Sequence, residues 1–246
     1  MKHFIFRNAN RFCSLLGYHL EKNKPASPAP VKLPKKKVDY SWLKKQQIKT
    51  FIDIGAYHGE YFDFAAEHFP AARIIAFEPQ PDAINFLEQK ATTLPNVTLF
   101  NLALGETNSS ATFYISGYAP SSSVLPMGEL HKQISPESGE LRPVTVEMKT
   151  LDSVLADSIL EENIFIKMDS QGYEDRIIAG GKKIFSQATV ILTEVSFAEL
   201  YEGQKLFDTI YLQLKELGFV LVGFKNQIYS PLDGRILQAH VYFIKQ

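Results

Sequence analysis

The chain has 246 residues, 45% of them hydrophobic and 22% charged, which is enough to bury one substantial core with or without a short appendage. Its single cysteine, Cys13, excludes an intrachain disulfide framework and a cysteine-rich zinc site, and so favours a reducing, cytoplasmic location. No apolar run reaches the ~18 residues that a membrane span needs. Residues 1–20 also lack the long apolar block and cleavage site of a signal peptide.

The formal net charge of −1 conceals an asymmetry along the chain. Residues 1–49 carry 12 Lys and Arg residues against two acidic ones, whereas the remainder carries 14 against 25. A basic arm on an acidic body is compatible with a solvated linker or with peripheral contact with an anionic membrane surface. The body shows no platform of basic and aromatic residues, so we expect no nucleic-acid partner.

The N-terminal part is predicted to differ from the rest of the chain. Apolar residues at helical spacing predict a short amphipathic helix over residues 4–17. Prolines and the run Lys35-Lys36-Lys37 predict an extended linker over residues 22–37. We therefore expect a basic helix and linker in residues 1–39 and a folded domain in residues 40–246.

Within residues 40–246, predicted strands and helices alternate. Several strands are continuous apolar runs, as expected when helices cover both faces of a sheet. The pattern predicts the α/β class with a doubly wound, mainly parallel sheet. The predicted strands are 50–54, 73–77, 97–102, 164–168, 189–195, 219–224 and 240–245, and the predicted helices are near 59–68, 81–91, 174–181 and 205–217.

The alternation is interrupted by an insertion at about residues 106–149. Strand-like segments at 111–115 and 144–148 flank a long polar stretch that contains His131. Loops of this length inside a domain are usually functional or disordered, and we expect this one to face a substrate. His131 is a candidate base because imidazole can remove a hydroxyl proton near neutral pH.

Two predicted strands end in carboxylates, with a glycine turn between them. Asp53 ends the first strand, Gly55 and Gly59 follow, and Glu78 ends the second strand. Glycines let a backbone approach a ligand closely, and a carboxylate in the place of Glu78 can accept hydrogen bonds from both hydroxyls of a ribose. The pattern predicts a site for an adenosine-containing cofactor. Because the Gly-x-Gly-x-x-Gly fingerprint is missing, it favours S-adenosylmethionine over NAD.

A second group of polar residues lies near the predicted strand 164–168. Lys167 and Asp169 are two apart and so share a face, and Asp169 ends the strand where open α/β sheets bind their ligands. Glu174 begins the next helix, where an acidic residue also suits the helix dipole. A Lys167–Asp169 ion pair is the structural alternative. Glu194, near the end of strand 189–195, would reach the same edge if the two strands are neighbours.

The carboxylates of Asp169 and Glu194 leave three kinds of chemistry open. Together they could bind a divalent ion, share a proton or hold the hydroxyls of a sugar. The sequence does not distinguish these, so a divalent metal stays an open question.

These segments together resemble the FkbM family of S-adenosylmethionine-dependent methyltransferases, over about residues 51–244. No single piece is specific, but their order and spacing are. The matching segments are Asp53-Ile54-Gly55-Ala56 with Gly59, Ala76-Phe77-Glu78-Pro79, Ala103-Leu104-Gly105, Ser121-Ser122-Ser123, Leu151-Asp152, Lys167-Met168-Asp169 with Gly172-Tyr173-Glu174, Glu194, Leu200-Tyr201-Glu202-Gly203-Gln204 and Leu217-Gly218-Phe219.

The resemblance implies a Rossmann-like methyltransferase fold with a seven-stranded sheet and an antiparallel last strand. It also implies that the turn from Asp53 to Gly59 holds the methionine part of the cofactor, that Glu78 holds the ribose, and that the segment Asn101, Leu102 and Ala103 meets the adenine. The chain departs from the family at Tyr57, where asparagine is common, and at His240, where an acidic residue is common.

We therefore predict an O-methyltransferase that acts on a hydroxyl of a sugar, glycan or small metabolite. Asp169 and His131 are the candidate bases, Glu194 and Lys167 are candidates for orienting the acceptor, and Glu174 is a further candidate. A non-catalytic binding module on the same scaffold and an NAD-dependent sugar oxidoreductase are the alternatives. The oligomeric state is left open.

Overall fold

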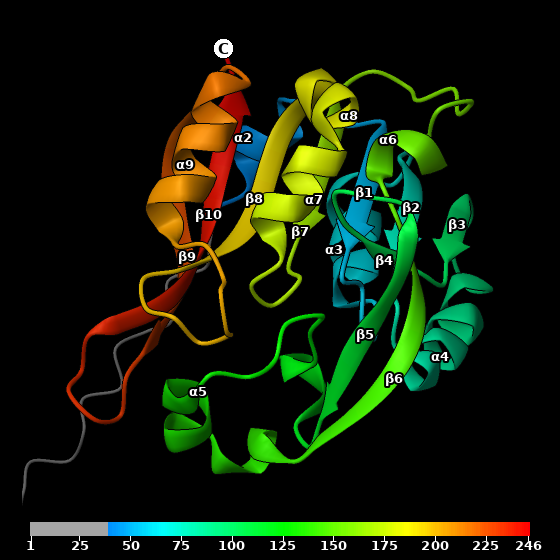
Figure 1. Cartoon of the computed structure of the whole chain (residues 1–246). Helices are drawn as coiled ribbons and strands as arrows, with labels where there is room; N and C mark the ends of the chain where they lie inside the picture. The colour runs from blue at the N-terminus through cyan, green and yellow to red at the C-terminus, as the bar shows by residue number, and fades with distance from the viewer. Residues whose placement is uncertain (1–38) are drawn as a thin grey trace, which may run out of the picture. The chain divides into compact units, whose positions relative to one another are not determined.

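A seven-stranded sheet forms the centre of the molecule in this computed structural model, which describes residues 39–246 (Figure 1). The strands follow the order β3-β2-β1-β7-β8-β10-β9. They are β1 (Thr50–Ile54), β2 (Arg73–Phe77), β3 (Val97–Phe100), β7 (Ile164–Met168), β8 (Ala188–Ser196), β9 (Phe219–Tyr229) and β10 (Ile236–Lys245).

The last strand, β10, runs antiparallel to both β8 and β9, whereas β3, β2, β1, β7 and β8 pair in parallel. The predicted α/β class, the mainly parallel seven-stranded sheet and the antiparallel last strand are all confirmed. The helix predicted at 4–17 and the linker predicted at 22–37 lie outside the described residues.

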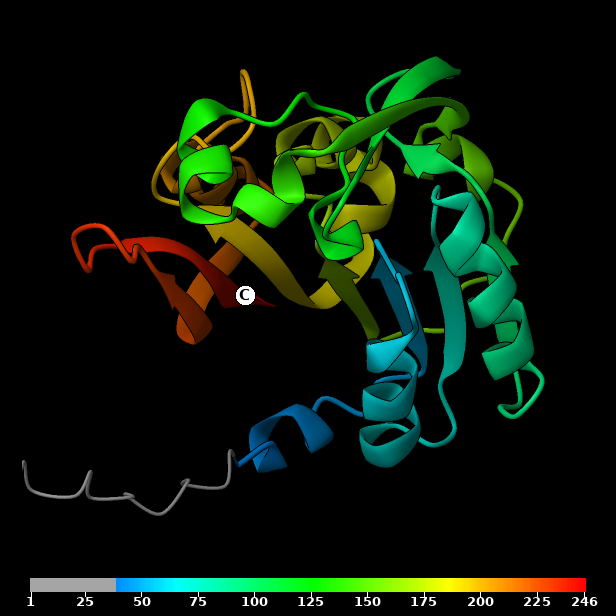
Figure 2. The ribbon, with the colours of Figure 1, turned by 90° about the horizontal axis from the view of Figure 1, so that it is seen from below.

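Helices cover both faces of the sheet because successive strand residues point to opposite sides. In β1, Phe51 belongs to the apolar cluster that includes buried residues of α2 (Ser41–Lys44), α3 (Glu60–His68) and α4 (Pro81–Ala91). Its neighbour Ile52 belongs to a second cluster, which includes buried residues of α7 (Glu174–Gly180), α8 (Lys182–Gln187) and α9 (Phe207–Glu216). Figure 2 shows α3 and the green and yellow segments on opposite sides of the sheet. A short helix, α6 (Leu151–Val154), leads into β7.

The predicted insertion supplies two strands of a second, three-stranded sheet in the order β4-β6-β5, and β4 precedes it. Its strands are β4 (Ala103–Leu104), β5 (Ser109–Ser116) and β6 (Leu141–Lys149), and the chain between β5 and β6 holds α5 (Glu129–Ile134) and the 3-10 turns η1 (Ala119–Ser121) and η2 (Pro136–Gly139). The Ser123 hydroxyl donates to the Gln171 carbonyl in the loop after β7 at 2.8 Å. The insertion is thereby fixed beside the end of that strand (Figure 1).

The structure differs from the predicted elements mainly at the last hairpin and in the short helices. β9 and β10 extend beyond the predicted segments 219–224 and 240–245; the added residues of β9 are largely exposed, whereas those of β10 are largely buried. Polar residues, at 225–227 in β9 and at Gln238 in β10, interrupt the apolar pattern there. None of the helices in residues 39–246 combines the length and hydropathy that a bilayer span requires.

Candidate functional site

A cavity of about 290 Å³ opens at the carboxyl ends of β1, β2 and β7. Its lining comes from the turn after β1, the end of β2, the segment around β4, the β5–η1 region and the loop after β7. Open parallel sheets bind their ligands at this edge. The volume lies near the lower end of the range for small-molecule sites, about 300–1,000 Å³.

Gly55 lines the cavity, but its need for glycine comes from the protein itself. It has a φ of +73°, and a Cβ at this position would lie 1.9 Å from the Asp169 carbonyl oxygen. Gly59 caps α3 with a φ of +69°, and a Cβ there would meet Leu87 and Lys90 of α4. The structure gives no support to a ligand contact at Gly59, because the missing Cβ of this residue faces α4. For Gly55 the decisive neighbour is the backbone after β7.

Asp53 and Lys167 form a buried ion pair behind the cavity. Asp53 is fully buried and lies opposite Lys167 in the β1–β7 register, with Oδ1 3.2 Å from the lysine Nζ. The lysine also donates to the Gly55 carbonyl at 2.6 Å and to the Ile54 carbonyl at 3.4 Å. Burial opposes the charge on Lys167, but the carboxylates of Asp53 and Asp169 outweigh it and raise the lysine pKa.

These contacts revise two predicted roles. Asp53 does not line the cavity, so the structure gives it no direct place beside a cofactor; it neutralises Lys167 instead. The three N–H groups of the Lys167 ammonium are directed to Asp53 and to two backbone carbonyls. No N–H group is left to hydrogen-bond an acceptor. The alternative of a Lys167–Asp169 ion pair is also wrong, because Lys167 pairs with Asp53.

Glu78 presents a buried carboxylate to the cavity. Its Oε2 accepts from the Tyr57 N–H at 2.7 Å and its Oε1 accepts from the Gln80 N–H at 2.8 Å. Each oxygen thus keeps a second lone pair for a ligand hydroxyl. Burial raises the pKa of Glu78 to about 7, although the two backbone N–H groups oppose the shift. The expected position of Glu78 beside a ribose is compatible with this geometry.

The segment after β3 has a divided role. Leu102 and Ala103 are buried and line the cavity, where they offer an apolar wall. Asn101 is exposed and does not line it; its amide instead donates to the Glu78 carbonyl at 2.9 Å. Asn101 therefore fixes the backbone that carries Glu78.

Glu174 holds the loop that follows β7. The side chain is 5% exposed, does not line the cavity, and its Oε1 accepts from the Ser170 N–H at 2.8 Å and from the Ser170 hydroxyl at 2.9 Å. Burial raises its pKa to about 7, against the opposing effect of hydrogen bonds. These contacts favour the structural role that the sequence left open for Glu174.

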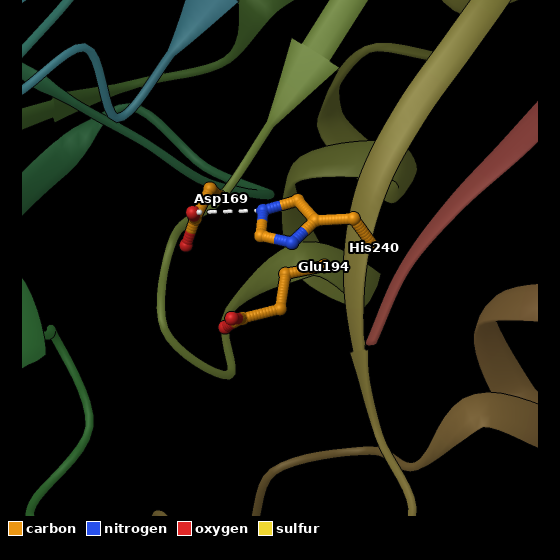
Figure 3. A group of neighbouring side chains, drawn as sticks. All are labelled: Asp169, Glu194 and His240. Carbon is orange, nitrogen blue, oxygen red and sulfur yellow. Dashed lines mark hydrogen bonds and ion pairs between the residues drawn. The ribbon is translucent and has the colours of Figure 1, made fainter. Parts of the chain in front are cut away.

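Three side chains, from the first residue after β7, from β8 and from β10, gather beside the cavity (Figure 3). Ligand atoms of Asp169, Glu194 and His240 lie within 4.8 Å of one another, and Asp169 itself lines the cavity. His240 Nε2 lies 3.4 Å from Asp169 Oδ2. β8 pairs in parallel with β7, and His240 lies opposite Glu194 in the β8–β10 register. The expectation that Asp169 and Glu194 share an edge is confirmed.

The two carboxyl groups differ in their preferred charge. Burial opposes ionisation of Asp169, but the hydrogen bond from His240 and the charge of Lys167 outweigh it and hold the Asp169 pKa well below its usual range. Burial, together with the charges of Asp169 and Glu174, raises the pKa of Glu194 well above its usual value. One carboxylate is thus ionised beside one that favours the neutral acid.

Amide side chains connect these carboxyl groups. Gln171 Nε2 donates to Asp169 Oδ1 at 2.8 Å and to Glu194 Oε2 at 2.9 Å. The Gln171 oxygen accepts from the Tyr201 hydroxyl at 2.7 Å, which fixes the orientation of the amide. Gln238 Nε2 also donates to Glu194 Oε2, at 2.9 Å.

His131 lies one layer away from this cluster. It is buried in α5, its ring lies 5.1 Å from the Tyr201 ring, and it does not line the cavity. Burial lowers its pKa, which favours neutral imidazole. A direct role as a base gains no support from this position, and His131 packs instead against the tyrosine that holds Gln171.

Sequence reasoning did not include His240, Gln171, Gln238 or Tyr201 among the site residues. His240 was visible only as a departure from the pattern of the FkbM family. Its placement depends on the insertion of the last strand beside β8, which gives it Glu194 as a neighbour. Gln171 has a φ of +53° in the loop after β7, a backbone conformation that no simple sequence pattern predicts.

Comparisons with known proteins show what the chain is similar to. The chain is 30% identical over 161 residues to the 2-O-methyltransferase NoeI of Sinorhizobium fredii (strain NBRC 101917 / NGR234). The aligned region covers 63% of this chain and 66% of that protein. It resembles the solved structure of methyltransferase FkbM from Methylobacillus flagellatus KT with 13% identity and a TM-score of 0.50, over 79% of this chain and 44% of that one. The chain thus spans just under two thirds of NoeI and less than half of the FkbM structure.

The family model described as the methyltransferase FkbM domain matches residues 53–221, which is more than half of the chain. The matched segment contains the turn after β1, Glu78, Asp169 and Glu194. The resemblance predicted from the motifs is confirmed, and the chain belongs to the FkbM family of methyltransferases.

Proposed function

We propose that the protein uses S-adenosylmethionine to methylate a hydroxyl group on a sugar, glycan or other small metabolite. The observation that carries the proposal is that Glu78, Gly55 and Asp169 line one cavity at the carboxyl edge of the sheet. This arrangement joins a carboxylate suited to a ribose with a second carboxylate suited to an acceptor hydroxyl. Membership of the FkbM family supports the same reaction class.

The residues present fit an adenosine-containing cofactor. The Glu78 carboxylate keeps a free lone pair on each oxygen, and Leu102 and Ala103 form an apolar wall in the same cavity. Lys167 holds the Gly55 carbonyl and so fixes the turn that borders the ligand. When bound, S-adenosylmethionine would supply a methyl group already activated by its sulfonium.

The chain's remaining tasks are to align the acceptor oxygen and to remove its proton. Asp169 can accept a hydrogen bond from the acceptor hydroxyl, because its depressed pKa keeps it ionised. His240, 3.4 Å from the same carboxylate, is placed to receive the proton or to stabilise the charge of Asp169. The pair therefore replaces His131 as the preferred base.

The acceptor class is supported by the relative NoeI, which is named a 2-O-methyltransferase. Polar groups of Ser122, Ser170 and Gln171 also line the cavity and suit a hydroxylated ligand. The NAD-dependent oxidoreductase loses its support, because the family is one of methyltransferases and the dinucleotide fingerprint is missing. A non-catalytic binding module would bind the same cofactor, so only a measurement of methyl transfer distinguishes it from an enzyme.

The test combines a panel of hydroxylated acceptors with isotope-labelled S-adenosylmethionine, with labelled product and S-adenosylhomocysteine measured by mass spectrometry. With an accepted substrate, Asp169→Asn should lower turnover by roughly 10²–10⁴-fold while the affinity for S-adenosylhomocysteine changes little. Asp157→Asn, at an exposed aspartate after α6, is the matched control and should retain turnover.

Full activity of Asp169→Asn would remove this carboxylate from the reaction. An equal loss of turnover and cofactor affinity would move Asp169 from the acceptor to the cofactor. Cofactor binding without methyl transfer to any member of a broad panel would favour the binding module.

A further inference from the structure

The cluster of Asp169, Glu194 and His240 has the composition of a metal site. Two carboxylates and one imidazole come from the end of β7 and from the neighbouring strands β8 and β10, with one ligand atom of each within 4.8 Å of the others (Figure 3). We propose that these three side chains bind one divalent transition-metal ion, such as Mn²⁺ or Zn²⁺, at the edge of the cavity.

An unpartnered carboxylate oxygen in the cluster supports a place for a ligand. Glu194 is 5% exposed, and its hydrogen bonds all use Oε2, so its Oε1 has no protein partner among residues 39–246. The second oxygen of a carboxylate on so buried a side chain is rarely left without a ligand, an ion or water.

The surrounding hydrogen bonds leave the donor atoms available. The Gln171 amide donates to Asp169 Oδ1 and Glu194 Oε2, which leaves Asp169 Oδ2 and Glu194 Oε1 without an amide donor. Hydrogen bonds of this kind orient the carboxylates around a metal in protein sites. In the part of the chain that the structure describes, no lysine or arginine lies within ion-pair distance of either carboxylate.

The donor set decides which ions fit. Carboxylates alone suit Mg²⁺ and Ca²⁺, whereas imidazole favours Zn²⁺ and other transition metals, so a mixed set favours Mn²⁺ or Zn²⁺. Ligand distances of about 2.0–2.2 Å place neighbouring donors about 3–3.5 Å apart. The distance of 3.4 Å between Asp169 Oδ2 and His240 Nε2 already meets this spacing. The Glu194 donor lies within 4.8 Å of the other two donors, and it has to move inward by whatever its distance exceeds about 3.5 Å.

A metal here would serve the proposed reaction, and this step rests on the proposed function. Three protein ligands leave coordination positions open, as in catalytic metal sites. An acceptor hydroxyl bound at one of them would be held beside Asp169 and would lose its proton more easily. Two neighbouring hydroxyls of a sugar could occupy two such positions.

The test is titration of the full-length, chelator-treated protein with Mn²⁺, followed by electron paramagnetic resonance of the free ion and by calorimetry. Wild-type protein should bind one equivalent of Mn²⁺. The affinity for this ion should fall at least about tenfold in both His240→Gln and Glu194→Gln. His68→Gln, which changes a similarly buried histidine on α3, is the matched control and should bind as wild type. His3, His19 and Cys13 could also bind metal. The occupancy of the proposed site is therefore taken as the difference in bound Mn²⁺ between wild type and the two variants.

S-adenosylhomocysteine binding is measured on the same samples. Intact cofactor binding without a Mn²⁺ equivalent, or with an equivalent that both variants retain, would overturn the metal site and leave the proposed function standing. A Mn²⁺ equivalent that depends on His240 and Glu194, in protein that binds no S-adenosylhomocysteine, would support the metal site and contradict the proposed function.

Discussion

Glu174 illustrates how a single carboxylate can be essential to a loop without reaching the ligand. It accepts two hydrogen bonds from Ser170, which shares with Asp169 the short loop after β7. Its pKa of about 7 lies above the value of 4.5 that it has in an unfolded chain, because burial disfavours the charge. The folded state therefore binds its proton more tightly, and its stabilising effect is lost as the pH rises from about 4.5 to about 7.

We predict that Glu174→Gln reduces the loss of stability between pH 5 and pH 8, measured by urea unfolding. The wild-type contribution is at most about 3 kcal/mol over this range, since each pKa unit corresponds to about 1.4 kcal/mol. At pH 5 the variant should lie within about 1 kcal/mol of wild type, because the glutamine oxygen can still accept from Ser170. Exposed Glu88→Gln is the control. A folded variant that loses methyl transfer would return Glu174 to the catalytic residues.

At the scale of elements, the turn between β1 and α3 is shaped by its contact with the loop after β7. Gly55 adopts a φ of +73°, and its missing Cβ leaves room for the Asp169 carbonyl. Gly203 has nearly the same φ, +74°, but no atom lies within 4 Å of its missing Cβ. The two glycines therefore separate the cost of backbone conformation from the cost of crowding.

We predict that Gly203→Ala costs about 1 kcal/mol in the free energy of unfolding, which is the strain of alanine at positive φ. Gly55→Ala should cost about 2 kcal/mol or more beyond that value, because its methyl group meets backbone that cannot rotate away. It should also lower S-adenosylhomocysteine affinity. Equal costs for the two substitutions, from urea unfolding curves, would show that the two loops do not pack as closely as described.

The strands that could be predicted to the residue are those buried on both faces. β1, β2 and β7 are short, mainly apolar segments ended by turns, and their bounds agree with the predicted segments. The helices α6 and α8 were missed because four and six residues are too short to establish a period. The carboxylates at strand ends were predictable for the same reason as the strands.

Partners across strands were not predictable, because they depend on register. Lys167 lies opposite Asp53 only once β1 and β7 are paired, and His240 lies opposite Glu194 only once β10 inserts beside β8. A sequence places Lys167 and Asp169 on one face but does not say which neighbour the lysine meets. The ion pair and the three-residue cluster are therefore results of tertiary structure.

At the scale of the whole molecule, residues 40–246 form one compact unit that contains every residue of the candidate site. We predict that deletion of residues 1–38 leaves cooperative unfolding and S-adenosylhomocysteine affinity unchanged. If the basic arm contacts anionic membranes, the full chain should bind phosphatidylserine vesicles more strongly than the deleted form, and added salt should weaken this binding. If vesicle binding changes neither with the deletion nor with added salt, the arm is a plain linker.

We expect the cavity to bind an adenosine cofactor through Glu78, and calorimetric titration with S-adenosylhomocysteine tests this most directly. We predict binding to wild type but no comparable binding of NAD. Affinity should fall about tenfold from pH 8 to pH 6, because a carboxyl with a pKa of about 7 then gains the proton that blocks a ribose hydroxyl. Glu78→Gln should bind about 1–3 kcal/mol more weakly and without this pH dependence, while Glu88→Gln should match wild type. Unchanged affinity in folded Glu78→Gln, or tighter binding of NAD, would contradict the account.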